Sequence, residues 1–256
     1  GKSLSQEWIE IIDDFASRRQ LWPHFSQLAL HEKPSTFLQV LCQALHNSDQ
    51  KKALKKFIKS IMKKCFDYDD EEESTKPFRN KSSTFLLESM LKYCDEKQFA
   101  KLYEKYFKGK LPEMAGNEFN FTIQRLFDFV SNKEIFEEMF NALSVNFSSL
   151  LQNNKTGVIL SISKACERLS FKQGQFIQSL VKALECEKSQ NHVIPCIATL
   201  LPSSAIEASL NNIEVHLHGS LILQNIMNFN KPIKIVQSLL EMKPQILSDI
   251  FCHQKG

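Results

Sequence analysis

Apolar residues recur along most of the chain with the spacing i, i+3, i+4 and i+7, and strict alternation of apolar and polar residues is nearly absent. This spacing is typical of amphipathic helices that bury one face. The predicted helices are short, roughly 12 to 18 residues each, and are separated by polar joints. We therefore expect an all-α fold, an α-solenoid in which short helices stack as repeats over residues 1–256.

The composition agrees with this prediction. Only 7 Gly and 8 Pro occur among 256 residues, fewer than turn-rich folds use. Dinucleotide-binding α/β domains, α/β barrels and β-sandwiches are therefore excluded. The 20 Phe residues predict an aromatic core.

Three seven-residue segments can be superimposed without gaps, and a fourth fits if a Glu replaces a Gln. They cover residues 35–41, 84–90, 120–126 and 220–226. The step from residue 88 to 124 gives a repeat near 36 residues, and the 100-residue step from 124 to 224 predicts three units, one of them short. The longer step from 39 to 88 predicts an insertion at about residues 67–77, which holds six acidic residues between Asp67 and Glu73.

The repeated segments carry candidate binding residues. On a helix, Asn120 and Gln124 are four positions apart, so their amides lie on one face and can pair with the edge of one nucleotide base. Phe121 can stack on a neighbouring base. The equivalent positions hold Ser35, Thr36 and Gln39; Thr84, Phe85 and Glu88; and Ser220, Leu221 and Gln224. Alternatively, the amides occupy a solvated face and Phe121 joins the core; recurrence of the pattern keeps both interpretations open.

Residues 51–64 combine seven lysines with an apolar stripe. The spacing predicts a helix with lysines on one face, which is a candidate phosphate-contacting surface. Its members would be Lys52, Lys55, Lys56, Lys59 and Lys63. The alternative is a solvated outer helix whose charge the acidic segment 67–73 balances.

The sequence contains no motif that predicts catalysis or the binding of a metal or cofactor. The chain has no glycine-rich phosphate-binding motif, and His216 and His218 should point to different faces of a helix, so neither an enzyme nor a metal or cofactor site is expected. The seven cysteines lack C-x-x-C spacing and predict free, buried thiols. No apolar run is long enough to span a membrane. Because the chain begins Gly-Lys-Ser, we expect it to be part of a longer protein.

The repeated pattern of Asn or Ser, an apolar or aromatic residue, two further residues and Gln or Glu resembles the second helix of Pumilio (PUF) repeats. Additional stretches are similar to a nucleolar branch of this family that acts in ribosome assembly. They are residues 106–111, 117–126, 157–169, 196–200 and 216–224. The resemblance is best over about residues 82–256.

This resemblance implies a curved array of repeats whose inner helices bind RNA. It further implies precursor rRNA and pre-ribosomal particle proteins as partners, a nucleolar location in the nucleus, and a role in restraining the processing of small-subunit (18S) rRNA. It implies no catalytic activity, cofactor or small-molecule substrate.

Carried over to this sequence, Asn120, Phe121 and Gln124 match the uracil-binding combination, and Glu88 matches the residue associated with guanine. Two of the other motifs lack the stacking aromatic, residues 157–163 are apolar at the binding positions, and Pro195 replaces the Gln of a further unit. The alternative function is a protein-binding scaffold of the HEAT or armadillo type, which the five Arg residues and the net charge of only +3 favour.

Overall fold

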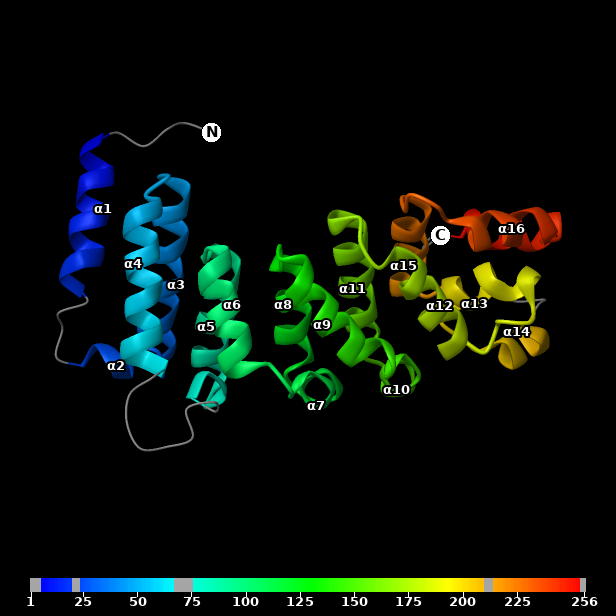
Figure 1. Cartoon of the computed structure of the whole chain (residues 1–256), viewed down its shortest axis with the longest axis horizontal. Coiled ribbons are helices and arrows are strands. Elements are labelled where there is room, and N and C mark those ends of the chain that lie inside the picture. Colours follow the sequence, from blue (N-terminus) through cyan, green and yellow to red (C-terminus); the bar gives the residue numbers. More distant parts are fainter. Residues whose placement is uncertain (1–5, 20–23, 67–75, 210–213, 254–256) are drawn as a thin grey trace. The chain divides into compact units, whose positions relative to one another are not determined.

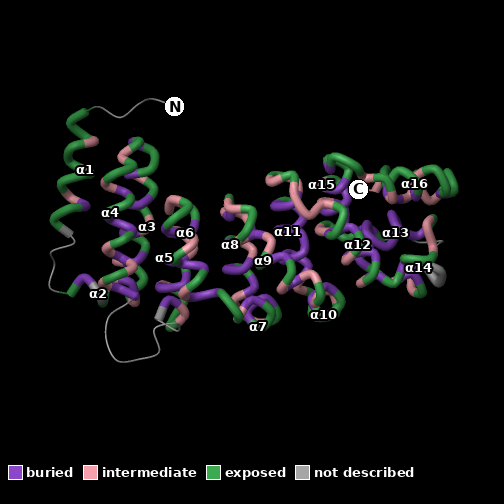
Figure 2. The backbone as a smooth tube through the Cα atoms, in the orientation of Figure 1, coloured by how far each residue is buried: buried purple, intermediate pink, exposed green. Residues whose placement is uncertain are grey.

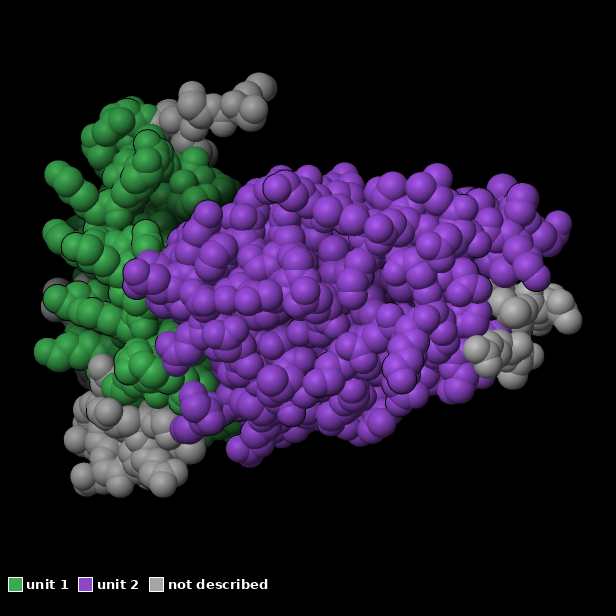
Figure 3. Space-filling view, turned by 45° about the vertical axis from the view of Figure 1, so that its right-hand side comes forward, with its two compact units in different colours: residues 1–108 green, residues 109–256 purple. Residues whose placement is uncertain are grey.

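The computed structural model describes residues 6–19, 24–66, 76–209 and 214–253. Throughout these residues the regular secondary structure is helical and no strand occurs (Figure 1), which confirms the all-α prediction. The chain divides into two compact units, residues 1–108 and 109–256 (Figure 3). The acidic part of the predicted insertion, residues 67–73, lies outside the described residues.

The first unit is built around the packing of α3 on α5, with α4 packed on α3 and on α1. Its elements are α1 (Gln6–Arg19), α2 (Phe25–Leu28), α3 (Glu32–Asn47), α4 (Lys51–Ile61), the π-helical turn η1 (Met62–Phe66), the 3-10 turn η2 (Lys76–Phe78), α5 (Lys81–Tyr93) and α6 (Glu96–Tyr106).

The second unit contains shorter helices than the periodicity predicts, and four of its helices have only six or seven residues. Its elements are α7 (Leu111–Gly116), α8 (Asn120–Phe129), α9 (Lys133–Ser144), α10 (Phe147–Gln152), α11 (Thr156–Leu169), α12 (Gln173–Ala183), η3 (Gln190–His192), α13 (Val193–Thr199), α14 (Ser203–Ser209), α15 (Leu217–Met227), α16 (Ile233–Glu241) and α17 (Pro244–Phe251).

Aromatic residues fill the core of each unit, as their number predicts. Buried residues line the helix faces that pack on neighbouring helices (Figure 2). In the second unit, Phe136 meets Phe127 edge-on at 6.0 Å, and Phe176 contacts both Phe147 and Phe229. Edge-to-face pairs of this kind add stability beyond the area that they bury.

Side-chain caps define where several helices begin. Asn80 and Asp95 each accept a hydrogen bond from a backbone N–H three residues on, at the starts of α5 and α6. The side chains of Ser83 and Gln98 return the bond to the backbone N–H of the cap residue. These reciprocal bonds satisfy N–H groups that have no partner inside the helix.

The packing order in the second unit departs from the order of the sequence. Helix α11 packs on α8 and on α15, and α15 also packs on α13. The row of packed helices therefore runs α8, α11, α15, α13, so that α15 lies between α11 and α13 although α13 precedes it in the sequence. Gln124 and Gln224 lie two helices apart in this row, and the prediction of three successive units between them is wrong.

Helix α13 is a core helix. All seven of its residues are buried, including Pro195, and Thr199 Oγ donates to the Pro195 carbonyl. The helix ends at Leu200, whose positive φ of 58° turns the chain. Helix α13, which carries Pro195 in place of Gln, thus presents no exposed side chain to a ligand.

Candidate nucleic-acid interface

The four repeated segments all lie on helices, on α3, α5, α8 and α15, and three of them share one hydrogen bond. In each of the three, the Gln side chain donates from Nε2 to the residue four positions earlier. The pairs are Gln39 to Ser35 Oγ at 3.2 Å, Gln124 to Asn120 Oδ1 at 3.2 Å and Gln224 to Ser220 Oγ at 3.1 Å. We call this bond the amide pair. The side-by-side placement that the spacing predicts is therefore present.

The first residue of each motif is buried and bonded within the protein. Asn120 Nδ2 donates to the Asn117 carbonyl at 3.0 Å, and Ser35 Oγ donates to the Ser82 carbonyl on α5 at 2.7 Å. Ser220 is buried, as is Thr84, whose Oγ donates to the Asn80 carbonyl at 3.0 Å. In this arrangement the first residue orients the Gln, and the Gln presents the more accessible polar group.

The second residue of the motif is the most exposed of the three in α5 and α8. Phe121 is 68% exposed and Phe85 is 53% exposed. Thr36 is exposed and Leu221 is half-buried, as are Gln39 and Glu88. An exposed Phe ring offers a flat apolar face on which a base can stack.

Gly157 on α11 completes the surroundings of Gln124. A Cβ at residue 157 would lie 2.8 Å from Gln124 Nε2 and 2.9 Å from Oε1, so the amide occupies the space that a side chain would fill. Val158 and Ser161, at the next binding positions of α11, are buried; Ser161 is polar, so these positions are not all apolar as predicted. Helix α11 therefore supports the amide of α8 and contributes no binding side chain of its own at these positions. The motif register places Gly157 37 residues after Asn120, but only the packing of α11 on α8 shows that it makes room for Gln124.

Arg168 also ties α11 to α8. Its guanidinium donates to the carbonyl of Phe127 at 2.8 Å and to that of Val130 at 2.6 Å, at the end of α8 where carbonyls lack helical partners. Burial lowers the pKa of Arg168, and the nearby Asp128 carboxylate opposes this shift. No local sequence signal identified this residue, because its role depends on tertiary packing.

The two histidines at the start of α15 lie together, which corrects the expectation that they point apart. His216 precedes the helix with extended backbone, and its Nδ1 accepts from the His218 N–H at 3.0 Å. His218 Nδ1 is 2.8 Å from Thr156 Oγ on α11. Burial and the nearby Lys164 lower the pKa of His218, which favours the neutral ring. No group of three metal-ligating side chains occurs in the part of the chain that the structure describes.

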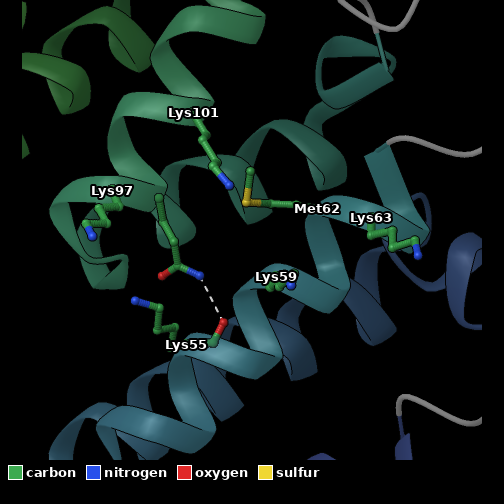
Figure 4. Close-up of a pocket in the computed structure, with 7 residues that line it drawn as sticks. Lys55, Lys59, Met62, Lys63, Lys97 and Lys101 are labelled. Carbon is green, nitrogen blue, oxygen red and sulfur yellow. Dashed lines mark hydrogen bonds between the residues drawn. The ribbon is translucent and has the colours of Figure 1, made fainter.

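The candidate phosphate-contacting lysines of α4 and η1 border two separate hollows. Lys52 and Lys56 line a hollow with Asp13 of α1. Lys55, Lys59 and Lys63 line a separate cleft of about 460 Å³ towards α6 (Figure 4). The predicted lysine face therefore contributes to two hollows, and only one of them is bordered by α6.

No described helix combines the length and the apolar character needed to cross a membrane.

Comparison with known proteins identifies relatives across the chain. The family model described as the NOP9-like PUF repeat domain matches residues 2–255. Nucleolar protein 9 of Homo sapiens is 28% identical over 193 residues, which cover 66% of this chain and 30% of that protein. Nucleolar protein 9 of Mus musculus is 26% identical over 248 residues, covering 85% of this chain and 38% of that protein. The chain thus spans less than two fifths of the length of either relative.

Among solved structures, one of APUM23 with the oligonucleotide GGAAUUGACGG superimposes with a TM-score of 0.73. The sequence identity is 20%, and the match covers 96% of this chain and 50% of that chain. At this identity the match establishes the fold, which is that of a helical repeat protein.

Proposed function

Because the chain belongs to the NOP9-like PUF repeat family, we propose that it binds RNA through the exposed positions of its repeated motif. The observation that carries the proposal is the amide pair, which recurs in α3, α8 and α15 with the Gln more accessible than its buried partner. A base could bond to the Gln amide and stack on the exposed residue beside it.

In this proposal, α8 carries the strongest site. Gln124 contacts the base edge, Phe121 stacks on a base, and Asn120 fixes the Gln124 amide from beneath. Thr84, Phe85 and Glu88 on α5 act in the same way with a carboxylate in place of the amide. The motifs on α3 and α15, with Thr36 and Leu221 at the stacking position, contribute weaker stacking.

The relatives named nucleolar protein 9 support a biological setting. We propose that the intact protein acts in the nucleolus, where it binds precursor rRNA of the small subunit together with pre-ribosomal proteins and restrains processing of that rRNA without catalysis. The uracils in the oligonucleotide of the APUM23 structure mark it as RNA, which supports RNA as the ligand class.

Fluorescence polarisation tests the proposal directly. The chain is titrated into labelled GGAAUUGACGG, a uridine-rich RNA of equal length and the corresponding DNAs, each at two salt concentrations. We expect tighter binding to RNA than to DNA, and affinity that falls as salt rises. If the chain binds none of these RNAs, RNA binding by these helices is refuted and the protein-binding scaffold becomes the favoured function.

The site assignment is tested with a double variant and a matched control. Asn120→Ala with Gln124→Ala should weaken binding of the preferred RNA about tenfold or more, since good base-edge pairs contribute about 1–3 kcal/mol. Gln152→Ala with Gln178→Ala removes two exposed amides from α10 and α12 and should leave affinity unchanged within about twofold. Equal affinities of both variants for every RNA would disprove the assignment to α8.

A further inference from the structure

The cleft between α4 and α6 concentrates positive charge on helices that carry none of the four motifs. One wall comes from α4 and η1 and the other from α6 (Figure 4). The first wall holds Lys55, Lys59, Met62 and Lys63, and the second holds Lys97, Gln98 and Lys101. The two walls come from segments more than thirty residues apart in the sequence, so the cluster exists only in the folded chain.

The walls are joined by bonds that leave the remaining lysines available. Gln98 Nε2 donates to the Lys55 carbonyl at 2.9 Å, drawn as the dashed line in Figure 4. Lys55 Nζ pairs with Asp95 Oδ2 at 2.5 Å. These two contacts connect the start of α6 to the middle of α4, and they engage the only amide and one of the five ammonium groups of the cleft.

The other four ammonium groups are exposed, and none forms an ion pair with an acidic side chain that the structure describes. They belong to Lys59, Lys63, Lys97 and Lys101. No aromatic ring lines the cleft, and the Gln98 amide is already bonded at both ends. A ligand that uses this cleft is therefore held by charge, without stacking on a ring and without base-edge hydrogen bonds.

We propose that this cleft is a second RNA site, separate from the motif helices, that binds the phosphate backbone of a double-helical RNA segment irrespective of its sequence. The inference rests on the proposed function for its choice of RNA as the polyanion. A paired helix fits these observations better than a single strand, because its bases are turned inward and its outer surface presents phosphates and 2′-hydroxyls. Lysine suits such contacts, since its compact charge attracts phosphate without imposing the planar geometry of arginine.

The structure supplies a matched control for the test. Lys52 and Lys56 lie on the same helix α4, are exposed, and line the hollow beside α1. The variant Lys59→Gln with Lys101→Gln removes one charge from each wall of the cleft. The variant Lys52→Gln with Lys56→Gln removes the same total charge from the hollow beside α1. All four side chains are exposed, so both variants should fold, which circular dichroism verifies.

Binding is measured with a labelled 16-base-pair RNA duplex of mixed sequence and with single-stranded GGAAUUGACGG. For the duplex, the cleft variant should lose about tenfold in affinity at low salt, and the slope of log affinity against log salt should fall by about two. The control variant should change duplex affinity by less than about threefold. Single-strand affinity should stay within about twofold of the parent chain in both variants.

The outcomes separate this proposal from the proposed function. If the chain does not bind the duplex, or if both variants lose equal affinity for the duplex, the second site is overturned. Single-strand binding in that case would still uphold the site on the motif helices. Duplex binding that depends on the cleft, without any single-strand binding, would uphold the second site and refute base recognition by the motif helices. Binding of poly-glutamate, with no binding of the duplex, would identify the cleft as a site for an acidic protein segment and overturn the RNA assignment.

Discussion

The Cα of Gly219 on α15 approaches the carbonyl of Ala198 at the end of α13 so closely that a Cβ at residue 219 would lie 2.4 Å from the carbonyl oxygen. The Ile197 oxygen would be equally close. The same carbonyl of Ala198 accepts the backbone N–H of His216 at 2.9 Å. Glycine is therefore required where α15 meets α13, because backbone atoms, unlike side chains, cannot turn away.

We predict that Gly219→Ala destabilises the chain. Overpacking against backbone should lower the free energy of unfolding by about 1–3 kcal/mol. Chemical denaturation followed by circular dichroism measures the change. Gly174→Ala on α12 is the control, since a Cβ there has open space and should stabilise the helix by up to about 1 kcal/mol. An unchanged denaturation midpoint for Gly219→Ala would contradict the close approach of Gly219 to the Ala198 carbonyl.

Gly157→Ala should act on binding more than on stability. The new methyl group would displace the flexible end of Gln124 and break its bond to Asn120, while alanine favours the helix of α11. We expect RNA affinity to fall about threefold to tenfold, in keeping with the loss of one hydrogen bond. The free energy of unfolding should change by less than about 1 kcal/mol. In a double-mutant cycle with Gln124→Ala, the effect of Gly157→Ala should vanish. Full additivity of the two substitutions would show that Gly157 does not act through Gln124.

Phe121→Ala should separate binding from folding. The ring is 68% exposed, so its loss should change the free energy of unfolding by no more than about 0.5 kcal/mol. Stacking of one base contributes about 1–3 kcal/mol, and RNA affinity should fall accordingly in polarisation assays. Val145→Ala, at a residue 80% exposed at the end of α9, is the control for removing an exposed apolar group and should not alter affinity. If both substitutions leave affinity unchanged, Phe121 is no stacking platform.

The Asp95 cap predicts a pH dependence of stability. Partial desolvation raises the pKa of Asp95, but hydrogen bonds from Lys55 and from the backbone N–H groups of Gln98 and Lys97 outweigh it, so the pKa lies below its usual range. Because the folded state favours the carboxylate, its stabilisation is complete above the unfolded pKa of about 4 and is lost as pH falls through the lower folded value.

Asp95→Asn tests this dependence, since it keeps a capping side chain and removes the charge. At pH 7 the variant should be less stable by about 0.3–1 kcal/mol, the usual effect of a carboxylate at a helix start. In urea titrations the difference should shrink below about pH 4. Asp49→Asn, at an exposed carboxylate paired with Lys51, should change stability little at either pH. A difference for Asp95→Asn that persists at low pH would refute the electrostatic origin.

The helical class and the motif positions could be predicted from the sequence because both follow from local periodicity. A spacing of four residues places Gln124 beside Asn120 in any helix, and the structure contains that bond. The same logic could not predict that Gly157 makes room for Gln124 or that Arg168 binds the end of α8, since both depend on which helix packs on which.

The lysines show the same limit. Periodicity shows that residues 51–64 have a basic and an apolar side, and a rotation of 100° per residue places the five candidate lysines within about 100° of one another on the basic side. It cannot show that α1 borders one hollow beside these lysines and α6 another, because that depends on tertiary packing. The prediction that His216 and His218 point apart is wrong for a related reason, because His216 lies just outside α15 and only His218 lies within it.

The packing of α15 on α11 has a consequence for synthesis of the chain. Asn225 and Asn228 of α15 bond to Ser163 and Glu167 of α11, so this face of α11 is covered only after residue 228 has been made. Translation at about 5–20 residues per second leaves the face uncovered for roughly 3 to 12 seconds while the intervening residues, about 60, emerge. The face of α11 that packs on α15 is therefore covered late in synthesis, and a nascent chain halted before α15 would present an apolar helix face to chaperones.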